Sequence, residues 1–338
     1  MIPPDKCVAV ERALGEAFGV KAFEDIQPLT SSAHSDPVFR IVVRGSPFVL
    51  RIITRTSDPG RYIACMNAAA AASLAPRVLY ASVEDRICIT GFVKAAPFLL
   101  AEALVRMPAA LRALHALAPF PGVPNHINTS CMFLLNGGPA VDGFLRKFQE
   151  ANLVPKEECD EVFACYELLA AVYPRDESDM VSSHNDLKPD NILFDGSSVR
   201  LLDWEAAFLN DRYSDLAAVA HFIVTNEAEE KTYLQEYFGQ APDERQLSRF
   251  FLLRQVSHLF YAMAYLLMTP AGDLINHGES ALEFKEFYRR LWEGELKLAD
   301  HRVRRSYGRV HWAQVVQNLR QSRFSEAMRI VAGRHGHE

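Results

Sequence analysis

The sequence predicts an α+β protein with two lobes, a small β-rich lobe at the N-terminus and a large, mainly helical lobe after it. Three observations carry this prediction. Short strand-like runs fill residues 23–92, helix-like apolar patterns dominate after residue 97, and a polar stretch with strand-like flanks interrupts the helices at residues 182–205. A chain of 338 residues can bury a large core, and we expect two units, residues 1–95 and 96–338.

The N-terminal lobe begins with a hairpin signal. PVFRIVV and PFVLRII are rich in β-branched and aromatic residues, and a short turn at residues 44–46 joins them. Asp58 and Pro59 have the pattern of an N-cap followed by proline at the first helical position, so we expect a helix to about Leu74. RVLYAS and RICITGF then supply two more strands, and residues 93–97 form a linker.

Helical patterns follow the linker. FLLAEALVRMPAALRALHAL, GFLRKFQEANL and KEECDEVFACYELLAAVY come before the polar stretch, and SRFFLLRQVSHLFYAMAYLLM and LEFKEFYRRLWEGELKL come after it. No internal repeat stands out. The order of elements therefore fits one β-rich lobe followed by one helical lobe.

The composition excludes several functional classes. Lys and Arg number 36 and Asp and Glu 42, a formal net charge of −6, so without a long basic run we expect no nucleic-acid partner. No run of about 18 apolar residues occurs and the N-terminal segment carries acids, so we expect no membrane partner and no signal peptide. The six cysteines form no CxxC pair, which favours reduced thiols and a cytoplasmic location. The tail GRHGHE is expected to fray, with at most adventitious affinity for metal.

The polar stretch SSHNDLKPDNILFDGSSVRLLDWE contains the residues with a chemical role. Asp186 and Asn191 are five residues apart, and Asp203 lies twelve further on. NILF and VRLLD read as strands joined by a turn, and such a hairpin would return Asp203 to the neighbourhood of Asn191. Carboxylate and amide oxygens suit Mg²⁺ that bridges nucleotide phosphates, and Asp186 could accept a proton from a substrate hydroxyl.

The motifs in and after this stretch resemble the kinase-like superfamily, in particular the aminoglycoside phosphotransferase and choline kinase family. The resemblance rests on HNDL at 184–187, NIL at 191–193, LDWE at 202–205 and DLA at 215–217, in the order the family has them. It implies a protein-kinase-like two-lobed fold, with ATP and Mg²⁺ as cofactors. It also implies a role for each of four residues: Asp186 as catalytic base, Asn191 and Asp203 as Mg²⁺ ligands, and Asp215 as a structural support of the catalytic loop. For His184 we expect a packed, hydrogen-bonded support of the loop, and the alternative is a reactant.

Two basic residues are predicted to contact phosphate. Lys188, two positions after the proposed base, could reach the transferring phosphoryl group, and the alternative is a solvated loop lysine. Arg51 alternates with Val49 and Ile53 in the run FVLRII, and it falls where the family's basic strand residue binds the nucleotide phosphates.

The sequence departs from the family pattern at two places. No acid occurs from residue 59 to residue 83, so the helix glutamate that usually orients the basic strand residue is missing, and Arg51 needs another partner. The loop LTSSAHSDPVF carries Ser31 and Ser32 where the family often has glycines. We expect these serines to contact phosphate, less closely than glycine backbone would.

The acceptor is predicted from the residues after Asp203. DWEAAFLNDRYSDLA resembles choline and ethanolamine kinases more than aminoglycoside-modifying members, so we expect a small hydroxyl-bearing amino alcohol as the acceptor. Aromatic walls and counter-charges for its ammonium group are sought among nine residues, for all of which core packing is the competing explanation. These are Trp204, Tyr213, Trp292, Trp312, Tyr261 and Tyr265 as aromatics, and Glu205, Asp211 and Glu283 as acids.

The leading hypothesis is an ATP-dependent kinase that moves the γ-phosphoryl group to an alcohol. Aminoglycosides, sugars and thiamine stay open as other acceptors. DLKPDN is typical of protein kinases, but no GxGxxG precedes VFRIV and no Ala-Pro-Glu segment follows Asp203. A catalytically weak nucleotide-binding module is the alternative of another class, which the missing helix acid favours and the intact Asp186, Asn191 and Asp203 oppose. The oligomeric state leaves no trace in the sequence.

Overall fold

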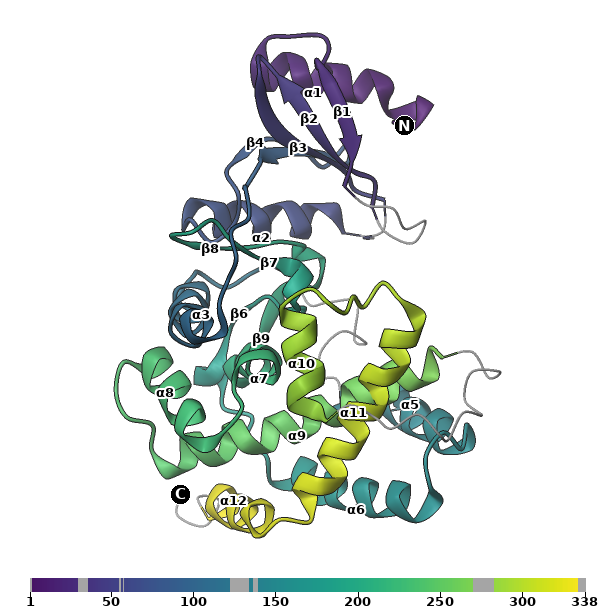
Figure 1. Ribbon diagram of the computed structural model, residues 1–338, viewed down its shortest axis with the longest axis vertical. Helices are drawn as coiled ribbons and strands as arrows, with labels where there is room; N and C mark the ends of the chain where they lie inside the picture. The colour runs from purple at the N-terminus through teal and green to yellow at the C-terminus, as the bar shows by residue number, and fades with distance from the viewer. Residues whose placement is uncertain are drawn as a thin grey trace.

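The computed structural model describes residues 2–29, 36–54, 56, 58–121, 134–135, 139–269 and 283–333. It has a small antiparallel sheet at the N-terminal end and a largely helical part below it, which confirms the predicted α+β two-lobed fold (Figure 1). The sheet has the order β1-β2-β3-β5-β4. Its strands are β1 Asp25–Pro28, β2 Val38–Val43, β3 Ser46–Ile52, β4 Val78–Ser82 and β5 Ile87–Gly91.

The β2–β3 hairpin is closed by a tight turn, as predicted. Arg44 and Gly45 both have positive φ, 51° and 72°, which matches the right-handed twist of the flanking strands. Alternate β2 residues, among them Phe39 and Ile41, are buried under α1 (Cys7–Phe18), a helix that the sequence analysis did not predict.

Helix α2 (Pro59–Ala71) begins as predicted, because the Asp58 side chain accepts a hydrogen bond from Arg61 N at 2.9 Å. It ends before the expected Leu74, since Ser73 takes a left-handed φ of 60°. The early end leaves the carbonyl of Leu74 to accept from Leu201 N at 2.7 Å, which ties the helix end to the C-terminal part of the chain.

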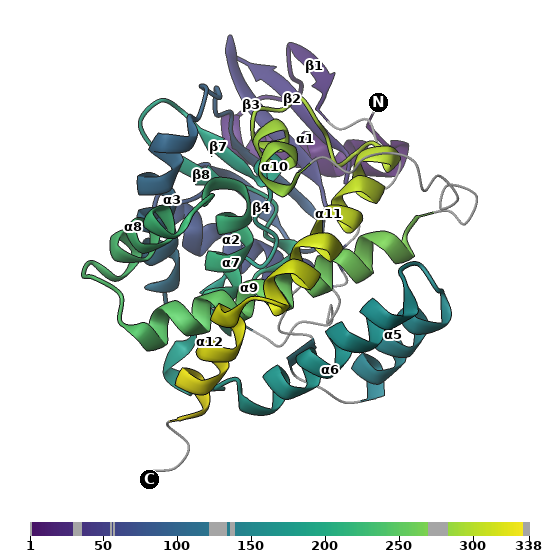
Figure 2. The same cartoon turned by 60° about the horizontal axis from the view of Figure 1, so that its bottom comes forward.

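The C-terminal lobe is built around α9 (Glu244–Leu267). This helix is buried along most of its length between α7 (Arg212–Ile223), α11 (His301–Leu319) and α12 (Ser322–Ala332) (Figure 2). All five predicted helical segments form helices. The segment from Leu282 is shorter than predicted, because its helix stops just before Gly294, which has a φ of 76°. The helices are α3 Leu100–His115, α5 Pro139–Glu150, α6 Lys156–Val172, α7 Arg212–Ile223, α8 Glu227–Phe238, α9 Glu244–Leu267, α10 Phe284–Trp292, α11 His301–Leu319 and α12 Ser322–Ala332.

Two small two-stranded sheets lie between the lobes and present the polar stretch. Strand β6 (Met180–Ser183) pairs with β9 (Phe208–Asp211), and β7 (Ile192–Phe194) pairs with β8 (Val199–Leu201). The second pair is the hairpin predicted from NILF and VRLLD. Ala96 N in the linker donates to Phe194 O at 2.7 Å, so the hairpin also holds the connection between the lobes.

Helix α9 is the one described helix that is long and apolar enough to cross a membrane by length and composition. Of its most apolar window, 72% is buried inside the protein. This is the pattern of a core helix in a globular fold, and packing against α7, α11 and α12 accounts for its apolar surface.

The contact between α9 and α11 leaves no room for a side chain at Gly308. A Cβ there would lie 2.9 Å from Leu266 Cγ and 3.1 Å from Leu266 N. We expect Gly308→Ala to lower the free energy of unfolding by about 1–3 kcal/mol, measured by urea denaturation. Gly15→Ala, in α1 with nothing within 4 Å, is the matched control and should be about 0.5–1 kcal/mol more stable than wild type. Equal stability of Gly308→Ala and wild type would contradict the tight packing.

Candidate active site

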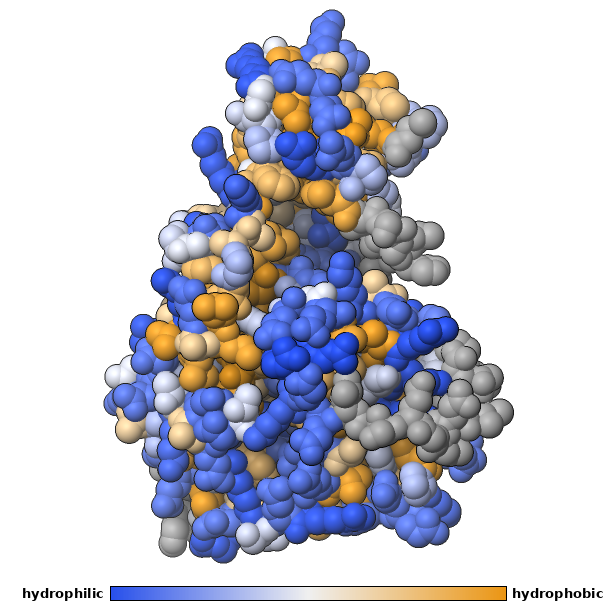
Figure 3. Space-filling view, viewed as in Figure 1, coloured by the Kyte–Doolittle hydropathy of each residue, from blue (hydrophilic) through white to orange (hydrophobic). Residues whose placement is uncertain are grey.

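A cleft lies between the sheet and the helical lobe, where the surface is hollowed (Figure 3). It encloses a cavity of about 350 Å³ with an apolar lining from both sides. Val38, Val49 and Thr90 line it from the sheet, and Leu193 and Leu202 line it from the opposite wall. Arg51, Asn191 and Asp203 bring polar groups to the same cavity.

Asp215 holds the backbone of the predicted catalytic loop, residues 184–191, in place. Its two carboxylate oxygens accept from His184 N and Asn185 N, each at 2.8 Å, and Oδ2 also contacts His115 Nε2 at 3.2 Å. Burial of this carboxyl would raise its pKa, but the His115 bond and the backbone donors outweigh burial and keep the pKa below its usual value. This geometry is that of the brace predicted for Asp215.

Two further contacts connect the catalytic loop to the Asp203 segment. The ring of His184 bonds Leu202 O through Nε2 at 2.8 Å. Asn185, with a φ of 66°, donates to Ala206 O at 3.1 Å and accepts from Asn210 at 2.6 Å. His184 is fully buried, so the structure places it as packed support rather than beside a substrate.

Asp186 is bonded to Asn191, which lines the cleft, and one third of the Asp186 side chain is exposed. Lys188 Nζ donates to Asp186 Oδ2 at 2.7 Å, and Asn191 Nδ2 donates to Asp186 O at 2.8 Å and to Oδ2 at 3.0 Å. Burial lowers the pKa of Lys188, yet the Asp186 charge more than offsets it and raises the pKa above the usual value. Lys188 is therefore a partly buried cation beside the proposed base.

The predicted hairpin does return Asp203 to Asn191. Leu202 N donates to Asn191 O at 2.9 Å, so the next residue, Asp203, lies beside Asn191. Asp203 has a left-handed φ of 68°, and Arg61 of α2 donates to Glu205 O at 2.9 Å and to Ala207 O. The bend at Asp203 is thereby fixed from both sides, which aims its carboxylate into the cleft.

Arg51 connects two carboxylates across the cleft. Its guanidinium contacts Asp36 Oδ2 at 2.8 Å and Asp203 Oδ1 at 2.8 Å, and it lies 5.0 Å from the ring centre of Tyr62 in α2. Burial alone would raise the pKa of Asp203 and of Asp36, but the Arg51 charge and its hydrogen bonds hold both pKa values below their usual range.

Asp36 fills the role of the missing helix glutamate. It is 3% exposed, and besides Arg51 it accepts from Thr54 N and Thr54 Oγ1, each at 2.8 Å. The acid that orients Arg51 therefore comes from the segment just before β2, while α2 supplies only the ring of Tyr62. Ser31 and Ser32, the predicted phosphate contacts, lie outside the described residues.

Three of the predicted substrate residues are almost fully buried. Trp204, Asp211 and Tyr213 are 1%, 2% and 2% exposed. Asp211 caps α7 by accepting from Tyr213 N at 2.8 Å and pairs with Arg249 at 2.9 Å, while the Tyr213 ring lies 4.8 Å from that guanidinium. The cation that Asp211 and Tyr213 contact is Arg249 of the protein itself, while the Trp204 ring packs against His184 and borders the cleft.

Other predicted substrate residues are distributed over the lobe. Trp312 is buried and donates to Glu158 at 3.0 Å, and Glu283 is an exposed residue at the start of α10.

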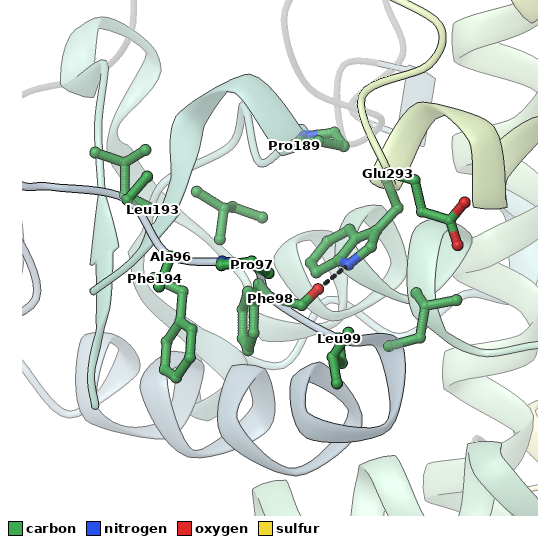
Figure 4. A pocket seen from close by; sticks show the side chains of 12 residues that line it. Ala96, Pro97, Phe98, Leu99, Pro189, Leu193, Phe194 and Glu293 are labelled. Carbon is green, nitrogen blue, oxygen red and sulfur yellow. Dashed lines mark hydrogen bonds between the residues drawn. The ribbon is translucent and has the colours of Figure 1, made fainter. Parts of the chain in front are cut away.

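Trp292 donates to Phe98 O at 2.7 Å and lines a second cavity of about 440 Å³ between the linker, β7 and the end of α10 (Figure 4). Pro189 of the catalytic loop borders that cavity. The Glu205 backbone is anchored by Arg61, and its side chain is half-buried.

Tyr265 of α9 lies beside the catalytic loop, as predicted for an acceptor pocket. Burial raises the pKa of Tyr265, and the charges of Lys188 and Asp186 also act on it. Tyr307 of α11 packs against it, with ring centres 4.7 Å apart. Tyr261 lies further along α9, 6.4 Å from the Tyr265 ring centre, within the same aromatic group.

The chain belongs to the phosphotransferase enzyme family, whose model matches residues 25–250. No curated protein matches the sequence. Among solved structures, a choline/ethanolamine kinase family protein from Mesorhizobium loti is similar, with a TM-score of 0.67 and 17% identity over 97% of this chain and 99% of that chain. The choline kinase LicA from Streptococcus pneumoniae has a TM-score of 0.55 at 14% identity over 92% of this chain and 98% of that one.

A third similar structure is a spectinomycin phosphotransferase in complex with ADP and spectinomycin. Its TM-score is 0.54 at 13% identity, over 92% of this chain and 98% of that one. At these identities the likeness shows the shared fold. The family match carries the reaction class, so the protein is a kinase-like phosphotransferase.

The sequence analysis missed Asp36, Arg61, Tyr62 and His115. Asp36 had a readable signal, because it is an acid directly before a strand that pairs with the Arg51 strand. Arg61 and Tyr62 follow an N-cap, where a sequence pattern says only that a helix begins. Nothing near His115 points to Asp215, since 100 residues separate them.

The buried contact between Asp36 and Arg51 predicts a charge-dependent loss of stability. We expect Asp36→Asn to lower the free energy of unfolding by about 1.5–3 kcal/mol at pH 7, because charged hydrogen bonds are lost. The folded pKa of Asp36 is depressed, so its contribution is present above the usual carboxyl pKa near 4 and is lost as the pH falls through the folded pKa. The difference from wild type should shrink at acidic pH in denaturant titrations.

Asp25→Asn is the matched control for this prediction. Asp25 is half-exposed and its contact with Arg40 is 3.6 Å, so its loss should change the stability by less than about 0.5 kcal/mol at any pH. A similar small change for Asp36→Asn would contradict the role given to Asp36.

Proposed function

We propose that this protein is an ATP-dependent kinase that transfers the γ-phosphoryl group to a hydroxyl of a small acceptor. The observation that carries the proposal is the convergence of Asn191, Asp203 and Arg51 in one cleft, with Asp186 bonded to Asn191. Such a set serves phosphoryl transfer, where positioning and charge do most of the catalysis.

The cleft has the properties of a nucleotide site. Its apolar walls could enclose a base, and Arg51 and Lys188 supply positive charge for the phosphates. The similar spectinomycin phosphotransferase binds ADP and LicA binds AMP in structures of this fold, which supports a nucleotide in the equivalent cleft here.

Asn191 and Asp203 fit a Mg²⁺ site by the chemistry of their donor atoms. The amide nitrogen of Asn191 is used in bonds to Asp186, which leaves its amide oxygen as the donor for an ion. The depressed pKa of Asp203 keeps its carboxylate ionised at neutral pH. Bound there, Mg²⁺ would neutralise phosphate charge, and hard oxygen ligands are what it prefers.

Asp186 is positioned to act as the base. The acceptor oxygen forms a bond to the γ-phosphorus, the bond from that phosphorus to the ADP oxygen breaks, and the hydroxyl proton passes to the Asp186 carboxylate. Lys188 balances the charge of Asp186 and lies where the transferred group would pass. ADP and a phosphate monoester are the products.

The acceptor is assigned to the amino alcohols, of the choline or ethanolamine kind. Trp204 and Tyr213 are buried, whereas Tyr265, on which the charge of Asp186 acts, is only partly buried and can face an ammonium group. Arg304 also acts on Tyr265, and a cation there favours neutral, hydroxyl-rich acceptors such as sugars instead. Both classes therefore belong in the test.

The roles of the two aspartates can be separated by mutation. We expect Asp186→Asn to keep Mg-ATP affinity within about threefold and to lower kcat by about 10²–10⁴-fold, the usual contribution of a general base. Asp203→Ala should lose Mg²⁺-dependent nucleotide binding as well. Calorimetry with Mg-ATP and coupled ADP release measure the two quantities. The exposed Asp160→Asn is the control, and normal turnover by Asp186→Asn would refute the base assignment.

The acceptor class can be read from ADP release against a panel. Choline, ethanolamine, other amino alcohols, thiamine, simple sugars and aminoglycosides should be compared with and without Mg²⁺. We expect an amino alcohol to raise the rate most, and expect Tyr265→Ala to raise its KM with a smaller change in kcat. Mg-ATP binding without turnover on any acceptor would favour the nucleotide-binding module, and a sugar as the best acceptor would reassign the substrate class.

A further inference from the structure

Three histidines converge in the core of the helical lobe. His221 comes from α7, His258 from α9 and His311 from α11, and they are 2%, 1% and 0% exposed. One ring nitrogen from each can be chosen so that all three atoms lie within 4.8 Å of one another. None of these residues takes part in the phosphoryl-transfer site described above.

Hydroxyl groups orient two of the rings. Nε2 of His221 contacts Ser257 Oγ at 3.0 Å, and Nε2 of His311 contacts the hydroxyl of Tyr288. When each Nε2–H donates to its hydroxyl, the Nδ1 atoms of both rings carry lone pairs. Histidines that bind metal usually donate their other ring N–H to an acceptor of the protein in this way.

The lone pair of His221 is not used within the described part of the chain. Its Nδ1 is buried and has no hydrogen-bond partner there, whereas Nδ1 of His311 contacts Nδ1 of His258 at 2.8 Å. A buried acceptor without a partner costs about 1–3 kcal/mol, and a cation would remove that cost. Burial lowers the pKa of all three histidines well below the usual value, so they are in the neutral form that ligates metal.

We propose that His221, His258 and His311 bind a divalent transition-metal ion of the zinc type. Zn²⁺ takes imidazole nitrogens at about 2.0–2.1 Å in tetrahedral geometry, which puts two ligand atoms about 3.4 Å apart. The observed spacing, from 2.8 Å for one pair to at most 4.8 Å, brackets this value, so small ring rotations suffice. Nitrogen ligands distinguish this site from the oxygen site proposed for Mg²⁺.

One histidine of the cluster borders a cavity at the surface. His258 lines a surface cavity of about 220 Å³, together with Val224, Gln255 and Phe284. A water molecule could reach the ion from this side. Arg254 lines the same cavity and is paired with Glu230 at 3.5 Å, so its charge reduces the affinity for a dication without filling the site.

A metal here would connect three helices that support the catalytic site. Helix α7 carries Asp215 as well as His221, and α11 carries Tyr307, whose ring centre is 4.5 Å from that of His311. The ion would therefore act on stability and on the position of these helices, and it would not touch the reacting groups.

The test is titration of the chelator-treated full-length protein with Co²⁺, in the absence of Mg²⁺ and nucleotide. We expect one equivalent to bind with the visible absorption of a four-coordinate nitrogen site, to be displaced by Zn²⁺, and to raise the thermal unfolding temperature. His221→Ala should lower the affinity at least 100-fold, and Ser257→Ala by about 10–100-fold through the orienting bond.

Two controls separate this site from other histidines. His301→Ala, an exposed position on α11, should bind Co²⁺ like wild type, and so should the double variant His335→Ala/His337→Ala in the C-terminal tail. No Co²⁺ spectrum, binding lost in the tail variant, or a folded His221→Ala variant that binds normally would each overturn the proposal. If His221→Ala does not fold, X-ray absorption of the wild-type Zn²⁺ form decides: three imidazoles support the site and two or fewer refute it.

Discussion

The architecture of the cleft depends on one guanidinium shared by two carboxylates. Arg51 comes from the sheet, Asp203 from the helical lobe, and Asp36 from the segment that enters β2. A buried cation needs carboxylate partners to offset the loss of its hydration. Asp36, held by Thr54, and Asp203, held by the bend in its backbone, are these partners. The contact therefore fixes both the distance between the lobes and the direction of the Asp203 carboxylate.

The rest of the site is built on backbone hydrogen bonds that hold strained residues. Asn185 and Asp203 both have positive φ, a conformation that costs energy for residues other than glycine. Asp215, Asn210 and Arg61 hold these bends from three different elements. Apolar side chains could not replace His184, Asn185 and Asn191, because each of these side chains bonds a backbone carbonyl that would otherwise lose that partner.

Sequence reasoning works here where the signal is local. The hairpin of β2 and β3, the cap at Asp58 and the order of the motifs from His184 to Asp215 all follow from neighbouring residues. It fails where the role of a residue depends on contacts with residues far away in the sequence. Asp211 and Tyr213 have the residue types of an ammonium site, but Arg249 from α9 occupies the position of that cation. Asp36 could not be assigned as the carboxylate partner of Arg51 from local sequence, because the pairing of β2 with β3 is what brings the two residues together.

The placement of Asp36 changes how this enzyme could be switched off. In protein kinases the acid sits on a helix whose movement makes or breaks the pair with the basic strand residue. Here Arg61 of α2 bonds the backbone of the segment after Asp203. A shift of α2 would not remove Asp36, the partner of Arg51, because Asp36 does not belong to this helix. A displacement of α2 would therefore leave the pair of Arg51 and Asp36 in place. A movement of Asp36, before β2, would break that pair.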